Sequence, residues 1–319
     1  MPELPEVEVV RLGLAPAVAG ATVTRVEVLD ERSLRRHDGP AEDFVQRLTD
    51  AVLGTPERRG KFLWVPVVSP EVSSSSPEIA GATAAAASDP PEKREALVIH
   101  LGMSGQVLLR QRAAARDRLT RVVLEVRHPE LGESRIDFVD QRIFGSMALD
   151  HLQPTTDDPQ QLVPSQVAHI ARDPLDPHFD DRAFLRALAR KQTTIKRALL
   201  DQTLISGIGN IYADEALWAA RVHYDQPTSS LSRPRAVAVL TEVRAVLGKA
   251  LAEGGTSFDA QYVNVNGASG YFSHSLNAYG RQGEPCARCG RPIVRESFMN
   301  RGSHFCAFCQ RVTVQRSHA

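Results

Sequence analysis

The sequence predicts an α+β protein of several domains, with a β-rich first half, a helical second half and a short cysteine-rich tail. Three observations lead to this prediction. Apolar and polar residues alternate in stretches of the first half, whereas apolar residues recur with helical spacing between residues 181 and 252. All four cysteines lie in the tail, and a length of 319 residues allows about two or three domains.

The β-rich half opens with one helix, predicted over residues 5–18. Pro5 suits the first helical turn, where its missing N–H would have no partner, and Gly20 supplies the stop. The following segments are rich in Val, Ile and Leu and are bounded by Gly and Pro. They predict strands within residues 21–29, 60–67, 95–110, 120–126 and 134–149.

A low-complexity segment interrupts this half between two predicted strands. Residues 69–94 are biased toward Ser, Ala and Pro and offer few large apolar side chains for burial. We therefore predict a disordered surface insertion, which the chain tolerates at a small cost in loop-closure entropy.

The second half changes to a helical pattern after a connection rich in Pro and Asp. Helices are predicted at residues 181–190, 194–204, 210–221 and 233–252. The expected domains are residues 1–152, a linker at 153–177, a helical domain at 178–280 and the cysteine tail at 281–319.

The formal net charge is zero, but the charges are segregated along the chain. The segment 182–197 holds six basic residues and no acidic one, and the segment 281–316 holds seven Arg against two Glu. Each block is either a solvated face or a surface that meets an anionic partner. No apolar run is long enough to span a bilayer and the acidic start is unlike a signal peptide, so a cytoplasmic protein is expected.

The cysteine spacing predicts a metal site. Two CxxC pairs are separated by sixteen residues, which is the spacing of a tetrahedral zinc site with four thiolate ligands, Cys286, Cys289, Cys306 and Cys309. Four protein ligands leave no open position, so one Zn²⁺ is expected to be structural. The segment between the pairs is predicted to be a hairpin whose tip presents Asn300, Arg301 and Gly302.

The stretch "LISGIGNIYADEAL" places two glycines in a tight turn before a helix that begins at Asn210. It is not a dinucleotide fingerprint, because Tyr212 stands where the third glycine belongs and a helix precedes the turn. A helix N-terminus suits a phosphate, and Lys191 and Lys196 would add positive charge. A purely structural helical hairpin is the alternative.

The stretch "HLGMSG" sets Met103 between two glycines at the end of an apolar strand. Most methionines fill cores, but a long apolar side chain in a loop can act as a wedge between bases. The stretch "DQRIFG" supplies Arg142 and Phe144 as companions.

The first residues, "MPELPEVE", suggest covalent chemistry at the N-terminus. Removal of the initiator Met would give Pro2 a free secondary amine, whose reference pKa of about 8 leaves part of it an uncharged nucleophile at neutral pH. Attack on a sugar C1′ would give an iminium ion, an electron sink that favours β-elimination. Glu3 is placed for proton transfer. The alternative is an ordinary capped helix.

These features together resemble the bacterial formamidopyrimidine-DNA glycosylase family over nearly the whole chain outside the insertion. The resemblance rests on "MPELPEVE", "RRGKFL", "HLGMSG", "DQRIFG", "LISGIGNIYADEAL", "SGYFSHSLNAYGRQGEPC" and "NRGSHFCAFCQR", in this order and spacing. It implies an N-terminal β-sandwich with a leading helix, a helix-two-turn-helix domain and a C-terminal β-hairpin zinc finger, with DNA in the cleft between.

The resemblance also implies roles for individual residues. Pro2 would be the Schiff-base nucleophile, Glu3 the acid/base, Lys61 the proton donor for β-elimination and Arg301 that for δ-elimination. The residues that would contact DNA are the wedge trio Met103, Arg142 and Phe144 together with Lys191, Lys196 and Asn210, and "SGYFSHSLNAY" would be a lid over the damaged base. Where the family commonly has a His-rich element this chain has Leu119, Thr120 and Arg121, with Arg121 as the substitute DNA contact.

The expected function is that of a bifunctional, monomeric repair enzyme acting on double-stranded DNA with oxidised or abasic sites. It would excise 8-oxoguanine and formamidopyrimidines and then nick the strand by β,δ-elimination. One alternative is the endonuclease VIII branch, which prefers oxidised pyrimidines. Another is a catalytically silent binder of damaged DNA, against which Pro2, Glu3 and Lys61 argue.

Overall fold

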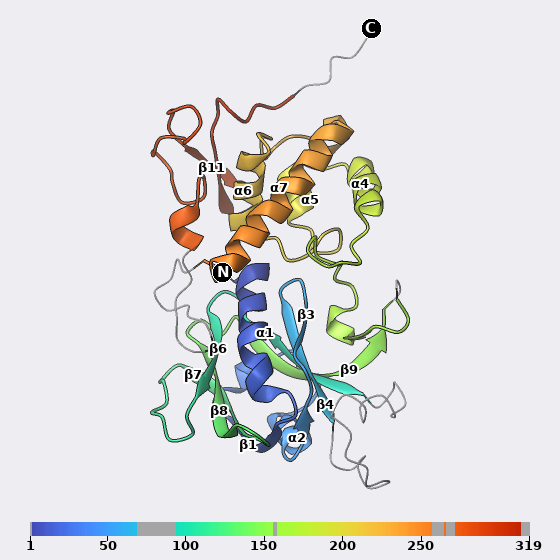
Figure 1. The fold of residues 1–319 in the computed structure, drawn as a ribbon, viewed down its shortest axis with the longest axis vertical. Coiled ribbons are helices and arrows are strands. Elements are labelled where there is room, and N and C mark those ends of the chain that lie inside the picture. The colour runs from blue at the N-terminus through green and yellow to red at the C-terminus, as the bar shows by residue number, and fades with distance from the viewer. Residues whose placement is uncertain (1, 69–93, 156–157, 257–264, 266–271, 314–319) are drawn as a thin grey trace. The chain divides into compact units, whose positions relative to one another are not determined.

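The computed structural model describes residues 2–68, 94–155, 158–256, 265 and 272–313, and the predicted insertion at 69–94 lies almost entirely outside them. The chain divides into two compact units (Figure 1). The sheet unit comprises residues 1–2, 6–169 and 257–270, and the helical unit comprises residues 3–5, 170–256 and 271–319.

The sheet unit is built on one long antiparallel path of strands. The strands are β1 (Thr22–Val28), β2 (Val52–Leu53), β3 (Glu57–Arg59), β4 (Phe62–Val68), β5 (Glu95–His100), β6 (Gly105–Arg110), β7 (Thr120–His128), β8 (Gly132–Asp140), β9 (Ser146–Pro154) and β10 (Leu162–Pro164). They are joined in the order β10-β9-β5-β4-β2-β1-β7-β8-β6, with β3 paired to β4. The segments 95–110 and 134–149, predicted as strands, each form two strands separated by a loop.

The core of the sheet unit lies between the two halves of this path. Alternate residues of β4, β5 and β9 on one side, and of β1, β7 and β8 on the other, enter one apolar cluster, as strand geometry requires. Helix α1 (Leu4–Val18) adds Val7, Val10 and Leu14 to the same cluster. This is the predicted β-sandwich with a leading helix, and α1 begins one residue before the predicted start.

Several short elements were not predicted. Helix α2 (Ala41–Leu48) buries only Phe44 and Leu48, and β2 and β3 are two and three residues long, so none carries a clear period. Strand β10 lies within the predicted linker 153–177 and pairs with β9. The boundary between the two units falls after residue 169, inside that predicted linker.

The helical unit contains α4 (Asp181–Arg190), α5 (Ile195–Leu199), α6 (Asn210–Ala219) and α7 (Arg233–Ala252). The bounds of α4 and α7 match the prediction; Asp180 caps α4 by accepting hydrogen bonds from the backbone N–H groups of Arg182 and Ala183. Helix α5 is shorter than predicted because the Asp201 side chain accepts from the Thr203 N–H and forms a turn instead.

The tail forms the predicted hairpin. Strand β11 (Val294–Phe298) pairs with β12 (Arg301–Phe305), and Met299 and Asn300 form a two-residue loop with φ of 47° and 60°. Two left-handed residues in succession are the type I′ geometry that matches the twist of the strands.

In the described part of the chain, no helix combines the length and the apolar content that crossing a membrane requires.

Candidate functional site

The carboxylate of Glu3 lies at the N-terminus of α6 in the helical unit. Its oxygens accept hydrogen bonds from the N–H groups of Gly209, at 2.6 Å, and of Ile211, at 3.0 Å. These are N–H groups that a helix start leaves without an intrahelical partner, and the helix dipole stabilises negative charge there. The hypothesis that this terminus binds a phosphate is therefore corrected: the protein's own Glu3, which is buried, occupies it.

The glycines before α6 leave the space in which the N-terminal segment packs. A Cβ on Gly209 would lie 2.3 Å from the Glu3 Cδ, and a Cβ on Gly207 would lie 2.6 Å from the Leu4 side chain. Gly207 also has a φ of +86°, and its carbonyl oxygen accepts from the Leu4 N–H at 3.0 Å. The glycine turn of "LISGIGN" therefore forms the surface on which residues 3 and 4 pack.

Lys61 lies in the turn between β3 and β4. Arg58 donates to the Gly60 carbonyl oxygen at 3.0 Å and to the Glu8 carboxylate at 2.8 Å, so it joins this turn to the first part of α1. The chain begins at the same end of α1, and Pro2 is buried. Within the sheet unit, these contacts fix the turn of Lys61 against the helix that follows Pro2.

Strand register brings two further loops to the edge where Lys61 lies. The first residue of β4 directly follows Lys61 and pairs with His100, the last residue of β5. His100 also pairs with Ser146, the first residue of β9. The loop 101–104 after β5 and the loop 141–145 before β9 therefore leave the sheet at the same edge.

His100 occupies the middle of this edge as a neutral imidazole. Burial, together with the positive charges of Arg36, Lys61 and Arg35, lowers the pKa of His100 to about 4. Its Nδ1 accepts a hydrogen bond from the Gly102 N–H at 3.2 Å. The arginine and lysine side chains here thus surround an imidazole ring that stays uncharged at neutral pH.

The predicted wedge residues stand out from this edge. Met103 and Phe144 are 46% and 49% exposed, so neighbouring loops present two large apolar side chains at the surface, and Arg142 is exposed in the same loop as Phe144. Gly102 packs so closely that a Cβ there would lie 2.3 Å from the Phe144 carbonyl carbon. The structure therefore brings together the three residues that the sequence singled out.

Two side chains that the sequence analysis missed hold the loop 141–145, here called the wedge loop. The Arg35 guanidinium donates to three successive carbonyl oxygens, those of Ile143 at 3.1 Å and of Phe144 and Gly145 at 2.5 Å. Asp140 accepts from the backbone N–H of Gly145 at 2.6 Å and from Ser104 Oγ, in the neighbouring loop, at 2.5 Å. Asp140 opens the quoted "DQRIFG", but nothing local marks Arg35, which is 108 residues from Ile143.

The wedge loop is strained at its centre. Ile143 has a φ of 56°, a conformation that a β-branched residue adopts at a cost of roughly 1–2 kcal/mol. The hydrogen bonds from Arg35 and to Asp140 supply the compensation. The backbone of the neighbouring Phe144 is thereby held in place, and its side chain is exposed.

Lys196 is placed differently from its predicted role. Its side chain is fully buried, and its Nζ donates to Asp214 Oδ1 and to Ser303 Oγ, both at 2.6 Å. The prediction that Lys196 contacts DNA directly is therefore corrected: its ammonium group binds Asp214 and Ser303 inside the protein. Burial lowers the pKa of Lys196, and the adjacent Asp214 carboxylate opposes that shift.

The other predicted contacts of the helical unit are accessible to different degrees. The Lys191 ammonium is about a third exposed and pairs with Asp201. Asn210, the first residue of α6, donates from Nδ2 to the Gly302 carbonyl oxygen at 3.0 Å. Asn210 thus joins the helix that holds Glu3 to the hairpin that carries Arg301.

Asp214 and Glu215, which sequence reasoning left unassigned, organise the helical unit from within α6. Asp214 also accepts from the backbone N–H of His304 at 2.8 Å, which ties β12 to the helix. Glu215 accepts from the N–H groups of Asn277, Ala278 and Tyr279. Adjacent acids in the apolar stretch "YADEAL" were the available signal, since buried carboxylates need such partners.

These bonds anchor the end of the predicted lid. Its residues 269–271 lie outside the described part of the chain, whereas Phe272–Ser275 form one short 3-10 helix. The described part leads through 277–279 to the partners of Glu215.

Arg301 is exposed at the start of β12, directly after the hairpin loop. A Cβ on Gly302 would lie 2.4 Å from Arg295 Nε across the hairpin, so the glycine allows the two arginine-bearing strands to approach. The guanidinium of Arg301 is thus presented at the tip, as predicted.

The four cysteines fit a structural zinc ion. The Sγ atoms of Cys286, Cys289, Cys306 and Cys309 lie within 4.8 Å of one another. Trp218 of α6 packs with this cluster, and the Arg288 guanidinium stacks 3.8 Å from the centre of its ring. The thiolates would hold one Zn²⁺, which joins the two ends of the hairpin and completes the small core.

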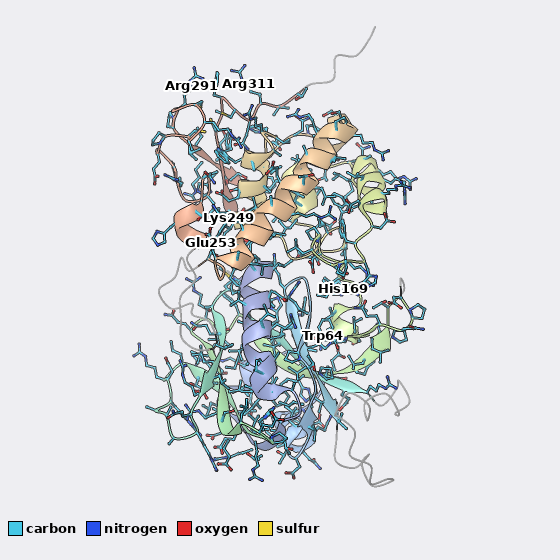
Figure 2. The ribbon with its side chains drawn as sticks, viewed as in Figure 1. Trp64, His169, Lys249, Glu253, Arg291 and Arg311 are labelled. Carbon is cyan, nitrogen blue, oxygen red and sulfur yellow. The ribbon has the colours of Figure 1, made fainter. Side chains whose placement is uncertain are left out.

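The outer side of the zinc module is basic. Arg291 and Arg311, labelled in Figure 2, lie with their guanidinium groups 3.6 Å and 5.0 Å from the ring centre of Phe308. These cation–π contacts order an aromatic ring that is 46% exposed.

The Arg121 guanidinium makes contacts within the protein instead of projecting freely beside Met103 and Phe144. Its Nε donates to the Asp140 carbonyl oxygen at 2.8 Å, and its guanidinium lies 3.7 Å from Asp30. Its side chain is only 17% exposed, so its predicted role as a substitute DNA contact stays a prediction.

Family models match three parts of the chain. The "Formamidopyrimidine-DNA glycosylase N-terminal domain" matches residues 1–147, the "Formamidopyrimidine-DNA glycosylase H2TH domain" matches residues 170–261, and the "Zinc finger found in FPG and IleRS" matches residues 283–312.

Whole-chain relatives carry the same name. The formamidopyrimidine-DNA glycosylase of Leifsonia xyli subsp. xyli is 61% identical over 319 residues, with 98% of this chain and 100% of the relative covered. That of Streptomyces coelicolor is 51% identical over 311 residues, with 98% of each chain covered.

Solved structures of similar proteins contain DNA. A complex of Lactococcus lactis Fpg with DNA containing an abasic site has a TM-score of 0.77 and 27% identity, with 97% of this chain and 99% of that chain covered. A complex of the wild-type Lactococcus lactis protein with DNA containing N7-benzyl-Fapy-dG has a TM-score of 0.76 and 27% identity, with 97% and 100% covered.

Proposed function

The chain belongs to the formamidopyrimidine-DNA glycosylase family and is a DNA glycosylase and AP lyase of base excision repair, and from this premise we propose which residues act and on which DNA. The substrate is double-stranded DNA with an oxidised purine, 8-oxoguanine or a formamidopyrimidine, or with an abasic site. The enzyme acts on it as a monomer. The observation that carries this proposal is the Glu3 carboxylate, held by α6 directly after the buried Pro2.

Pro2 acts as the nucleophile once the initiator Met has been removed. Its secondary amine attacks C1′ of the damaged nucleotide; the C1′–N bond to the base breaks, the base leaves with a proton, and the amine loses its own. The C1′–O4′ bond then breaks, O4′ takes a proton, and the opened sugar is left as an iminium on the Pro2 nitrogen. The resulting iminium has no nitrogen proton to lose, so it withdraws electrons from the sugar until elimination occurs. Glu3, fixed by two backbone donors, exchanges protons with the sugar.

Strand cleavage follows from the same iminium. Loss of the C2′ proton expels the 3′ phosphate by β-elimination, and a further proton loss expels the 5′ phosphate by δ-elimination. Lys61 serves the first elimination and Arg301 the second, each also neutralising phosphate charge. Lys61 lies in a two-residue turn, and Arg301 directly follows another. Each charged side chain is therefore presented on a rigid backbone.

The wedge trio stabilises the DNA after the damaged nucleotide leaves the stack. Met103 and Phe144 would fill the vacated space, and Arg142 would contact the orphaned partner base. The exposure of two large apolar side chains on a braced, strained loop supports this assignment.

We expect Gly209→Ala to reduce excision of 8-oxoguanine by roughly 100-fold, the usual scale for a misplaced acid/base group. The new methyl would occupy the position of the Glu3 carboxylate, 2.3 Å from its Cδ. Single-turnover rates at saturating enzyme measure the effect.

Gly248→Ala is the matched control, because that glycine lies inside α7 and a methyl group added there would have no atom within 4 Å. It should keep the full rate and raise stability by about 0.5–1 kcal/mol. A full excision rate for Gly209→Ala would show that the Glu3 position is unimportant.

We expect Arg35→Ala to slow 8-oxoguanine excision by about 10- to 100-fold, because loss of charge-assisted hydrogen bonds worth roughly 1.5–3 kcal/mol releases the strained wedge loop. Cleavage of a duplex with a preformed abasic site should change by no more than about twofold, since no base has to be unstacked. Arg35→Lys should recover only part of the rate, because an ammonium lacks the planar fork. An equal loss on both duplexes would contradict the positioning role.

The choice between lesion classes is tested with two duplexes that differ only at the lesion base pair. We expect 8-oxoguanine opposite cytosine to be excised at least tenfold faster than thymine glycol, a difference of about 1.4 kcal/mol in activation free energy. The reverse order would place the chain with the endonuclease VIII branch. Binding of both duplexes without any cleavage would leave only a damage-binding protein.

A further inference from the structure

A basic pocket in the helical unit is lined by none of the residues assigned to catalysis or DNA contact above. It has a volume of about 410 Å³ and lies between α4, the short 3-10 helix Thr228–Ser230 and the first turn of α7. Figure 1 shows α4 beside that end of α7. The volume is within the range of sites that bind ligands in proteins.

The rim of the pocket carries three arginines, Arg182, Arg186 and Arg233. In the described residues, none of the three has a carboxylate partner. The nearest acids along the chain are engaged elsewhere, since Asp180 caps α4 and Asp181 pairs with Arg244. The rim therefore offers three uncompensated guanidinium groups.

The floor of the pocket is apolar. Leu185, Leu188 and Leu231 line it, and the α4 residues that do so follow the helical spacing of one face. A ligand with both anionic and apolar groups fits this pocket best, because the arginines bind the anionic groups and the leucines bury the apolar ones. A nucleic-acid backbone supplies the charge but no apolar group to fill the floor.

We propose that this pocket binds an acidic peptide segment of a partner protein, with carboxylates on the three arginines and a bulky apolar side chain on the leucines. Arginine pairs carboxylates through two parallel hydrogen bonds, and an apolar anchor in a concave site provides most of the affinity in such contacts. The surface would tether the enzyme to another protein without occupying the residues that meet the lesion.

The test uses the full-length, zinc-loaded protein and a fluorescein-labelled octapeptide of one-letter sequence DDEDLDLF. Fluorescence anisotropy should show saturable binding with Kd on the order of 10–100 μM, as for short-motif recognition. The peptide DDEDSDSS, which keeps the acids but lacks the apolar side chains, should bind at least about tenfold more weakly.

The double variant Arg182→Glu/Arg186→Glu should weaken binding of DDEDLDLF by more than about tenfold. Arg190→Glu is the control for charge on this helix: it reverses one arginine of α4, where the double variant reverses two, and Arg190 does not line the pocket. It should leave the peptide Kd within about twofold of wild type.

Three results would overturn the proposal. One is the absence of saturable binding up to about 1 mM peptide. Another is an equal effect of Arg190→Glu, which would indicate diffuse charge attraction. The third is displacement of the peptide by an undamaged DNA duplex, or loss of duplex affinity in the double variant, which would make the pocket a DNA contact. Single-turnover excision of 8-oxoguanine by the double variant should equal that of wild type.

Discussion

Replacing Pro2 with glycine is expected to reduce covalent trapping of the enzyme on 8-oxoguanine DNA by borohydride well below the wild-type level and to lower excision by roughly 10³-fold or more. The variant keeps an N-terminal amine, but a primary one: the imine it forms can lose its nitrogen proton and ceases to be a permanent electron sink. Denaturing gels of borohydride-treated reactions measure the trapped fraction, and single-turnover assays measure excision.

The matched control is Pro5→Ala, which removes a proline from the same segment and leaves the Pro2 amine untouched. Pro5 belongs to the first turn of α1, where its role is conformational, so trapping should persist. Intact-mass analysis must also show that active protein lacks Met1. Trapping of Pro2→Gly at the wild-type level, or retention of Met1 in active protein, would exclude the mechanism.

Cys306→Ser, or removal of zinc by a chelator, is expected to weaken binding of a lesion duplex by about 100-fold or more while the sheet unit stays folded. Cys306 is fully buried with Trp218, and the hairpin that presents Arg301 directly precedes it. The metal would supply the four coordinate bonds that join the two CxxC segments. Anisotropy with the duplex measures affinity, and metal analysis gives the zinc content.

Phe308→Ala controls for general damage to the same module, because this half-exposed ring lies between two metal ligands without being one. It should retain one zinc ion per chain and a folded hairpin. Circular dichroism should show the strand signal of the sheet unit in both variants. Full duplex affinity in metal-free protein would show that the zinc hairpin plays no part in binding.

Much of the fold was predictable because its signals are local. Asp180 marks the start of α4, Pro234 and Gly254 mark the two ends of α7, and apolar residues recur with helical spacing in both helices. The four thiolate ligands are likewise a matter of spacing, and the structure brings their Sγ atoms together as predicted. The short α2, β2 and β3 escaped prediction since elements of two to eight residues carry too little periodicity.

The sequence by itself determined the family, the zinc ligands and the candidate chemical groups, Pro2 and Glu3 among them. Only the tertiary structure decided what those groups touch. The Glu3 carboxylate binds an N–H group 206 residues away and takes the helix terminus that a phosphate was thought to need, while Lys196 turns inward to Asp214. The physical reason is that caps, turns and metal knuckles are contacts between near neighbours along the chain. A buried charge instead takes whichever partner the packed chain brings within hydrogen-bond distance, and no local pattern encodes that choice.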